Sequence, residues 1–423
     1  MAAVAIGGPP SSAAGPCDEV ATPGPGAAQD LVDSLSPGQT GCLRAGLYEG
    51  NVKVETSGIT LTGYASEKAT VKGRFWIAEG ADNVTVESLY LDGTNPNTLP
   101  SPTVNGDGAT FRRNDVTNYN HSICFALGHP DWGRADNTTI EFNRIHNCGR
   151  LPATNHDHGI YVTTATNTLI RGNWIYDNAD RGIQLYPDAQ NTTITGNVID
   201  GNGQGIIFSG EFGIASNDNV VEGNVIANSK LRNNVESWYP PGNPIGRNNV
   251  VRNNCVKGGA YDEGSGGIGD QRGYRVVDAL RTTPAYASRS RRDFRLAAGN
   301  PCRDVLAAYR TTVPGPDGAT RASRAQRRAP AVILGALREQ IQRGQRLPMI
   351  GRVASRRLRR GLRVVVVARV RGHRHRLARV RVRGNGTFSL RPRVRAALGA
   401  RFVRVHAVVR GVGRSRTIRV RLR

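Results

Sequence analysis

Long apolar runs are missing from this sequence of 423 residues: no stretch reaches the roughly 18 apolar residues that a membrane-spanning helix needs. The chain also lacks a Cys-x-x-Cys pair, which argues against a thiolate metal centre. Its 51 glycines follow no period of three, and this excludes a collagen-like fibre. The hydrophobic residues, 38% of the total, suffice for a folded core.

Acidic residues are nearly absent from one end of the chain. Residues 321–423 contain 31 Arg and a single acid, Glu339, whereas residues 1–320 contain 26 Lys and Arg against 32 acids. The net charge of +24 therefore comes from the tail. Because a phosphate backbone would repel the larger part of the chain, we expect no nucleic-acid partner.

The six cysteines form an even set. Taken in order, they suggest the pairs Cys17–Cys42, Cys124–Cys148 and Cys255–Cys302. A bridge across each of these loops would contribute about 3–4 kcal/mol. Other connectivities are open, and six buried thiols in a cytosolic protein are the alternative.

The first residues look like the remnant of an export signal. Residues 2–6 are apolar and residues 12–15 are small, like a cleavage region, but the basic segment that should precede them is missing. A start codon assigned too late would explain this. We therefore expect a secreted or cell-surface protein.

Asn-rich segments recur through the middle of the chain. They share the register apolar-x-x-Asn-x-apolar, and their reference positions, 24 to 30 residues apart, are Ser88, Asn114, Asn143, Asn173, Asn197, Asn224 and Asn254. Such a period is typical of a repeat architecture. Short β-branched runs between Gly and Asn predict two or three strands per repeat, stacked as the coils of a parallel β-helix. The stacked Asn would tolerate left-handed backbone and form an amide ladder.

Both flanks of the repeats agree with this fold. Residues 30–35 carry apolar side chains at helical spacing and can cap the open end of the first coil. A pattern of Leu, Pro-Gly and Gly-x-Tyr over residues 31–48, together with the Asn repeats, resembles the right-handed parallel β-helix proteins of the pectin-lyase-like superfamily. Residues 293–301 are similar to its last-coil motif, and residues 316–337 to a degraded form of the segment that follows it.

The resemblance covers about residues 17–310 and points to the secreted branch common in high-GC Gram-positive bacteria. It implies an all-β solenoid. It does not select a function, because the superfamily contains lyases, hydrolases, epimerases and non-catalytic binding members.

Apolar residues alternate with Arg from about residue 350 onward, which predicts half-buried strands of a small antiparallel β-sandwich. Asn385-Gly386 predicts a hairpin turn there. The expected domains are a leader over 1–16, a β-helix over 17–310, a linker over 311–345 and an Arg-rich module over 346–423. The module could dock onto an anionic cell-envelope polymer, or its Arg could simply form a solvated face.

Gly-Ile pairs at Ile160, Ile183 and Ile206 recur every 23 residues, so the strands that contain them should stack. Inward-facing isoleucines leave Tyr161 and Gln184 outward in one column. This outward face is the predicted site.

Two further columns precede it and carry the candidate catalytic residues. Asp157 and Asp180 would lie about 5 Å apart, the spacing of the carboxyl pair in retaining glycoside hydrolysis. His158, Arg181 and Gln204 form the other column. Either His158 or Arg181 could remove the proton α to a uronate carboxylate, as the resemblance to lyases implies. The alternative is structural: the aspartates cap turns, and Arg181 pairs with them across coils.

No metal site is assigned. Asp157 and Asp180 could hold Ca²⁺ instead of acting on substrate. His156, Asp157 and His158 lack a third ligand at a recognisable spacing for a transition metal.

Substrate contacts are expected from Tyr161, Gln184, Tyr186, Glu211 and, one coil earlier, His121. Trp132 and Trp238 could add sugar platforms, and inserts at 128–136, 210–216 and 233–246 could wall a groove. The interpretation is a secreted protein that binds or processes a polysaccharide, with a lyase or glycoside hydrolase as the enzymatic form. The alternative is a non-catalytic surface protein in which the β-helix is a glycan-binding spacer.

Overall fold

The computed structural model describes residues 17–306, 309 and 312–316 of the first part of the chain. Beyond them it describes residues 332–336, 340–341, 345–347, 349–353, 363–370, 373–382, 387–393, 402–409, 413–414 and 418–422. The chain forms two compact units, which divide between residues 325 and 326. The expected leader over residues 1–16 lies outside the described residues.

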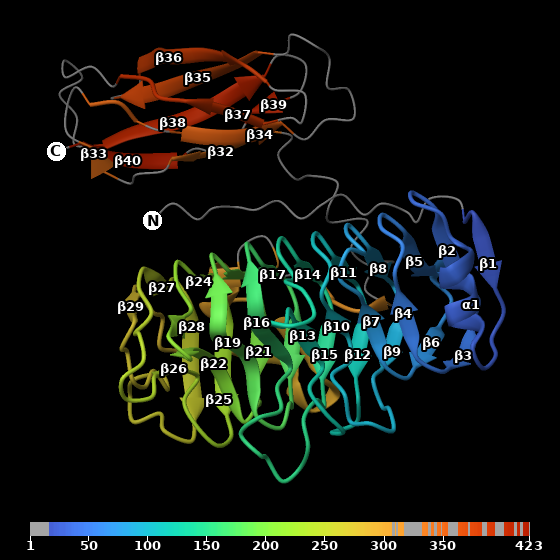
Figure 1. The fold of residues 1–423 in the computed structure, drawn as a ribbon. Helices are drawn as coiled ribbons and strands as arrows, with labels where there is room; N and C mark the ends of the chain where they lie inside the picture. Colours follow the sequence, from blue (N-terminus) through green and yellow to red (C-terminus); the bar gives the residue numbers. More distant parts are fainter. Residues whose placement is uncertain are drawn as a thin grey trace. The chain divides into compact units, whose positions relative to one another are not determined.

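The first unit is a parallel β-solenoid with three sheets (Figure 1). Sheet A consists of β1 (Glu19–Ala21), β2 (Thr40–Leu43), β5 (Thr60–Gly63), β8 (Thr85–Glu87), β11 (Thr110–Arg112), β14 (Thr139–Glu141), β17 (Leu169–Arg171), β20 (Thr193–Thr195), β24 (Val220–Glu222), β27 (Asn249–Arg252) and β29 (Tyr274–Val277). Sheet B consists of β3 (Gly46–Glu49), β6 (Ala69–Lys72), β9 (Tyr90–Asp92), β12 (Asp115–Thr117), β15 (Arg144–His146), β18 (Trp174–Tyr176), β21 (Val198–Asp200), β25 (Val225–Ser229) and β28 (Cys255–Gly259).

Sheet C carries the predicted site. It consists of β4 (Val52–Val54), β7 (Phe75–Ile77), β10 (Thr103–Val104), β13 (Phe125–Leu127), β16 (Ile160–Thr166), β19 (Arg181–Gln190), β22 (Gln204–Glu211) and β26 (Val235–Trp238), with β23 (Ile214–Ala215) antiparallel to β22. Figure 1 shows these strands side by side along the solenoid. The all-β parallel solenoid predicted from the repeat is confirmed.

The three-residue strands explain why so few apolar residues per coil suffice for a core. In sheet A one residue per strand points inward, and this column runs Leu61, Val86, Phe111, Ile140, Ile170, Ile194, Val221 and Val251. All of these side chains are buried in one continuous core. Each coil therefore covers the apolar surface of its neighbours, as repeat stacking requires.

The predicted Asn ladder is confirmed at the turn between sheets A and B. In each link an Asn Nδ2 donates to the Oδ1 of the Asn one coil further on, at 2.9 to 3.1 Å. The same Oδ1 accepts the backbone N–H of the donating Asn. The column comprises Asn114, Asn143, Asn173, Asn197, Asn224 and Asn254, all fully buried. These amides satisfy the backbone groups that the sharp turn would otherwise leave unpaired.

The first member of the predicted column is wrong by one residue. Glu87 pairs with Arg112, so Leu89 and not Ser88 lies beside Asn114, and the Leu89 N–H donates to the Asn114 Oδ1 at 3.1 Å. The repeat alignment chose Ser88 because it is polar, whereas the pairing of the strands determines that Leu89 lies beside Asn114.

Left-handed backbone occurs beside the ladder rather than in it. The residue before each ladder Asn has positive φ, as in Phe142 (φ 56°) and Gly196 (φ 67°). A Cβ on Gly196 would also lie 1.9 Å from Cδ2 of Tyr309, which packs on this turn. A separate, exposed column contains the left-handed Asn, among them Asn167 and Asn191.

The predicted N-terminal cap is helix α1 (Ala27–Ser34), which buries Leu31 and Val32. A Cβ on Gly41 in β2 would lie 3.0 Å from Leu31 Cδ2, so glycine allows the helix to approach the first coil closely. One 3₁₀ turn, η1 (Tyr64–Ser66), interrupts the second coil.

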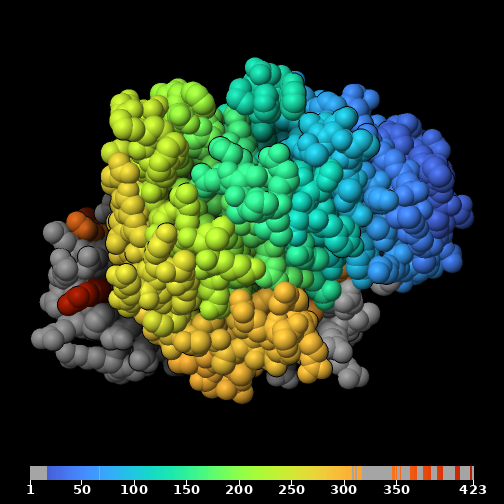
Figure 2. Space-filling model, turned by 90° about the horizontal axis from the view of Figure 1, so that it is seen from below, coloured from blue at the N-terminus to red at the C-terminus, as the bar shows by residue number. Residues whose placement is uncertain are grey.

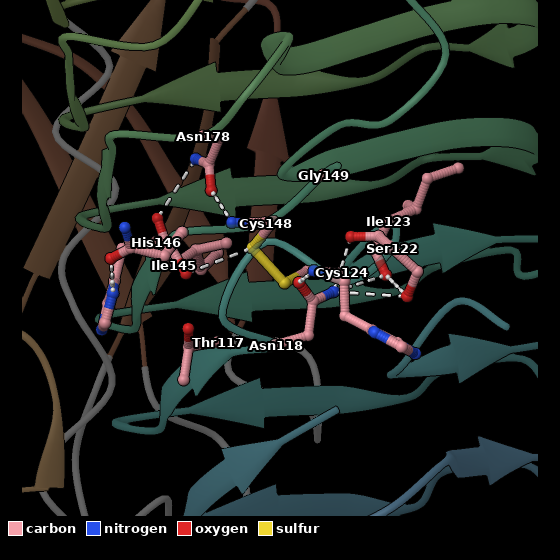
Figure 3. Close-up of a disulfide and its surroundings, with 12 residues drawn as sticks. Thr117, Asn118, Ser122, Ile123, Cys124, Ile145, His146, Cys148, Gly149 and Asn178 are labelled. Carbon is pink, nitrogen blue, oxygen red and sulfur yellow. Dashed lines mark hydrogen bonds between the residues drawn. A yellow bond between two sulfur atoms is a disulfide. The ribbon is translucent and has the colours of Figure 1, made fainter. Parts of the chain in front are cut away.

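The three disulfides pair in the order suggested by the sequence: Cys17–Cys42, Cys124–Cys148 and Cys255–Cys302. Figure 3 shows the second, which joins adjacent coils beside a further amide column. The Cys148 N–H donates to the Asn178 Oδ1 at 3.0 Å, and the Asn178 Nδ2 donates to the Asn202 Oδ1 at 2.8 Å. Cys148 thus occupies the position that Asn178 and Asn202 occupy in the following coils. Its disulfide to Cys124 links this coil to the preceding one, where an amide would otherwise do so.

After the last coil the chain folds back over sheet B. This strap, residues 286–306, contains β30 (Tyr286–Ser288), η2 (Arg289–Arg291), β31 (Asp293–Leu296) and α2 (Cys302–Leu306). Phe294 packs on Trp174 and Tyr176, with ring centroids 5.5 and 5.0 Å apart. In Figure 2 the strap, in orange, lies against the green and yellow-green coils.

A buried carboxylate holds the strap. Asp200, 1% exposed, accepts hydrogen bonds from Tyr286 Oη at 2.8 Å and Arg289 Nε at 2.7 Å.

We expect Asp200→Asn to lower the free energy of unfolding by about 1.5–3 kcal/mol, because it replaces charge-assisted bonds by neutral ones. Urea unfolding measures this, and hydrogen exchange should accelerate in the strap. Asp131→Asn, in an exposed loop, is the control; equal effects of the two substitutions would contradict this role.

The C-terminal unit contains two sheets that share one core. One consists of β32 (Val332–Ala336), β34 (Met349–Val353) and β37 (Thr387–Leu390), and the other of β33 (Gln340–Ile341), β40 (Ile418–Leu422), β38 (Phe402–Val409), β35 (Arg363–Val370), β36 (His373–Arg381) and β39 (Gly413–Arg414). Strands β32 and β33 lie within the range interpreted as a linker. In β35, Val364 and Val366 are buried, whereas Arg376 and Arg379 in β36 are exposed, as the alternation predicts.

The predicted hairpin at Asn385-Gly386 is wrong in its pairing. These two residues lie outside the described ranges, but β36 and β37 on either side belong to different sheets. An Asn-Gly pair indicates a turn, but it does not indicate which strand the following segment pairs with. Among the described residues, no helix has the length and apolarity to cross a membrane.

Candidate functional site

One outward column runs along the whole of sheet C. Strand register places Lys53, Trp76, Thr103, Ala126, Tyr161, Gln184, Ile207 and Glu236 side by side, one per coil. The predicted stacking of Ile160, Ile183 and Ile206, with Tyr161 and Gln184 in one column, is therefore found.

Arg181 is the centre of the polar cluster on this face. Its Nε donates to Gln204 Oε1 at 3.0 Å, and its Nη1 donates to the Asn155 carbonyl at 2.7 Å and to Gln184 Oε1 at 3.3 Å. Its Nη2 donates to Asn155 Oδ1 at 2.8 Å. All these acceptors are neutral.

Arg181 is 6% exposed, and no carboxylate of the described residues lies within ion-pair distance of its guanidinium. Burial lowers the pKa of Arg181 to about 10, although the charge of Asp180 opposes this shift. Such a buried cation, bonded only to neutral acceptors, has a charge that an anion can balance.

Glu236 is a site residue that the sequence interpretation missed. Gln204 Nε2 donates to Glu236 Oε1, and Asn233 Nδ2 donates to Glu236 Oε2 at 2.5 Å. Gln204 thus presents its oxygen to Arg181 because its amide nitrogen is engaged by Glu236. The segment 233–246 was interpreted as an insert, which is wrong for residues 235–238, since they form β26. The alternation Val235-Glu236-Ser237 was the available signal.

His158 lies one coil before Arg181. It is 2% exposed, its ring meets that of Tyr161 edge-on at 5.4 Å, and its Nδ1 has no hydrogen-bond partner within the described part of the chain. Burial, reinforced by the charges of Arg181 and His156, lowers the pKa of His158 well below its usual value. The imidazole is therefore neutral in the folded protein.

This burial predicts a pH-dependent stability. The unfolded chain binds a proton at His158 below about pH 6.5 that the folded chain does not, so the free energy of unfolding falls as the pH drops below that value. The slope approaches about 1.4 kcal/mol per pH unit for this residue alone. Urea unfolding at a series of pH values measures it. His158→Gln should remove this contribution, and Ile199→Val, a core substitution without a titratable group, should keep it. An unchanged slope in His158→Gln would disprove the assignment.

Two tyrosines form the exposed part of the face. The rings of Tyr161 and Tyr186 stack with centroids 6.2 Å apart, and both are partly exposed. Tyr186 Oη donates to Glu211 Oε2. Burial raises the pKa of Tyr161 to about 12, and burial together with the hydrogen bond to Glu211 raises the pKa of Tyr186. Both phenols are therefore protonated at neutral pH.

The two candidate aspartates stack on adjacent coils but are enclosed. Asp180 Oδ2 accepts the Asp157 N–H at 3.0 Å, and the two side chains are 6% and 5% exposed. Arg150 holds Asp157 through two bonds, at 2.6 and 3.2 Å. Thr154 Oγ1 lies within 3.5 Å of both carboxylates. These contacts fix the turn that carries Asn155, the partner of Arg181.

The other predicted site residues are spread more widely. His121 Nε2 contacts the Asn95 carbonyl at 2.6 Å in the turn between sheets B and C, so its ring is engaged there. Beside sheet C, Trp132 and Phe212 are exposed in loops, and Trp238 is the exposed last residue of β26. Phe212 was not singled out from the sequence. Within the described residues, no group of three His, Cys, Asp or Glu is arranged to hold a metal ion.

The comparisons with known proteins concern the solenoid. Residues 103–269 match the family model described as the right-handed beta helix region. The solenoid is a right-handed β-helix. The β-helix resembles the crystal structure of pectate lyase Pel9A, with a TM-score of 0.45 and 13% identity over 67% of this chain and 90% of that one. It also resembles the structure of the PL6 family alginate lyase AlyGC, with a TM-score of 0.32 and 14% identity over 62% of this chain and 51% of that one. No curated protein matches the sequence.

Proposed function

We propose that this protein binds a uronate-containing polysaccharide on the outer face of sheet C and cleaves it by β-elimination. The observation that carries the proposal is Arg181: a buried guanidinium, held by four bonds to neutral acceptors, with no carboxylate partner among the described residues. A sugar carboxylate fits this position because it supplies the missing negative charge in a planar geometry that Arg matches.

The reaction would proceed from that contact. Arg181 withdraws negative charge from the bound carboxylate, which acidifies the carbon-bound proton next to it. The Tyr186 oxygen takes that proton while its own hydroxyl proton moves to Glu211. The C–H electron pair forms the new C=C bond, the glycosidic C–O bond breaks, and the leaving oxygen takes the proton of the Tyr161 hydroxyl.

The predicted catalytic aspartates have a positioning role in this scheme. Asp157 and Asp180 hold the turn of Thr154, and this turn places the two oxygens of Asn155 on Arg181. His158 and Gln184 line the site as neutral groups.

Incubation of the full-length protein with a panel of uronate polysaccharides tests the reaction. Elimination yields products with a C=C bond conjugated to the carboxylate, which absorb in the ultraviolet. New reducing ends without this absorbance would show hydrolysis and overturn the elimination. Binding without any product would favour the glycan-binding spacer, and a neutral polysaccharide is the control for the requirement for carboxylate.

The proposed site of action is outside the cytoplasm. Three disulfides support this, because such bridges persist in oxidising compartments. The substrate class agrees with it, since structural polysaccharides lie outside the cell.

A further inference from the structure

The two units of the chain differ in the sign of their net charge. Residues 1–320 contain 26 Lys and Arg against 32 acids, whereas residues 326–423, in the C-terminal unit, contain 29 Arg and one acid, Glu339. A linear polymer of uronates carries a negative charge on each sugar, and a surface of the same sign repels it. The net charge of the solenoid therefore does not attract the polymer that it is proposed to cleave.

Exposed arginines line one face of the C-terminal unit. Strand β36, the last strand of its sheet among the described residues, carries Arg376, Arg379 and Arg381, all exposed. In the neighbouring β35, the exposed Arg363 lies directly opposite Arg381 (Figure 1). A β-bulge at Leu377 keeps Arg376 on the same face as Arg379. These four arginines are called the arginine strip below.

The arginine strip has no counter-charge among the described residues of its own unit, which contain neither Asp nor Glu. Like charges directly opposite in a sheet destabilise the pair of strands, and Arg363 and Arg381 are such a pair. Arg346 and Arg393, both exposed, lie opposite each other in a second bridge. An anionic partner would relieve this repulsion.

An apolar surface lies beside the arginines. Val365 is opposite Arg379, and Val367 is opposite Arg376, and both valines are half-buried. The residues on either side of Val365 are fully buried, so alternation along β35 directs Val365 and Val367 to the outer face. The C–H groups of a sugar ring can cover these valines while its carboxylate meets the planar fork of an arginine. A polymer of phosphates alone would supply only the charge.

We propose that the arginine strip binds a linear acidic polysaccharide and thereby keeps it on the chain that cleaves it. This inference rests on the proposed function, because it assigns the same class of polymer to the second unit. A polymer bound by one unit is at a high effective concentration for the other unit of the same chain. The charges agree with this arrangement, since the basic unit supplies the attraction that the acidic solenoid lacks.

Retention of the full-length protein on immobilised polygalacturonate tests the arginine strip. We expect the triple variant Arg376→Gln, Arg379→Gln and Arg381→Gln to bind about tenfold more weakly or worse at physiological ionic strength, because it removes three charges from one face. The methyl-esterified polymer, which has the same sugar rings without their charge, should not retain the unaltered protein. Circular dichroism checks that each variant is folded.

The matched control removes the same number of charges from exposed positions of the solenoid. It is the triple variant Arg247→Gln, Arg275→Gln and Arg281→Gln. This variant should be retained as strongly as the unaltered protein. Inorganic polyphosphate serves as a competitor, and at equal charge it should displace the protein less effectively than soluble polygalacturonate does.

The outcomes separate this inference from the proposed reaction. Equal losses in the two triple variants, unchanged retention of the β36 variant or no retention of any protein would mean that the strip binds no polysaccharide and only protects the edge of its sheet. Stronger competition by polyphosphate would overturn the choice of partner. A loss confined to the β36 variant, without unsaturated product from the unaltered protein, would uphold the strip and overturn the elimination. Product formation with equal retention of both variants would do the reverse.

Discussion

Arg181→Lys is expected to lower the rate of glycan cleavage by about 10²–10³-fold, the usual effect of removing a preorganised donor to developing charge. Lysine keeps the positive charge but has no planar fork. It cannot bind a carboxylate bidentately while also bonding to Gln204 and Asn155. The initial rate of unsaturated product formation measures the effect, with substrate affinity determined separately.

The matched control is Arg171→Lys. Arg171 is nearly as buried as Arg181, at 7% against 6% exposure, but it lies on sheet A and is ion-paired with Glu141. We expect this variant to lose stability and to retain its cleavage rate per folded molecule. Similar rate losses in the two variants would mean that Arg181 acts only through the fold.

Asn197→Ala is expected to lower the free energy of unfolding by about 3 kcal/mol or more. Asn197 Oδ1 accepts both the backbone N–H and the side-chain Nδ2 of Asn173 at 2.9 Å, and its own Nδ2 donates to the Ile170 carbonyl and to Asn224 at 2.9 Å. Alanine removes all four bonds, so the Asn173 backbone N–H loses its acceptor and the Ile170 carbonyl loses its side-chain donor, whereas Asn173 Nδ2 keeps the Ile140 carbonyl and Asn224 Oδ1 keeps the backbone N–H of residue 197. Each buried group left unpaired costs about 1–3 kcal/mol, and each of the other two lost bonds about 0.5–1.5 kcal/mol. Urea unfolding monitored by circular dichroism measures the loss.

The control is an asparagine whose side-chain amide is exposed to water. Asn191 lies in the exposed column and has φ 53°, which glycine adopts without strain. Asn191→Gly should therefore cost less than about 1 kcal/mol. If it destabilises the protein as much as Asn197→Ala, burial of the amide is not the source of the ladder's contribution.

The local pattern of the sequence predicted the elements that depend on one coil and its neighbour. The Asn period, the helix over residues 30–35 and the outward pair Tyr161 and Gln184 all follow from strand and helix periodicity. The order of the cysteines suggested the correct pairs because each disulfide joins two cysteines that are consecutive along the chain.

The errors occur where register or sheet membership depends on distant contacts. Ser88 was preferred to Leu89 because polarity, and not strand pairing, guided the alignment. The strand containing Glu236 was hidden in an apparent insert, and the strands before and after Asn385, β36 and β37, belong to different sheets instead of pairing as a hairpin. No local pattern reports which strand a segment will pair with.

The sequence by itself therefore determined the repeat, the stacked columns and the outward pair Tyr161 and Gln184 of sheet C. Only the tertiary structure decided their chemistry. It encloses Asp157 and Asp180, leaves Arg181 without a carboxylate among the described residues, and brings Glu236 to Gln204. The physical reason is that side-chain direction follows from alternation along a strand, whereas burial and pKa depend on the loops and coils that cover each residue.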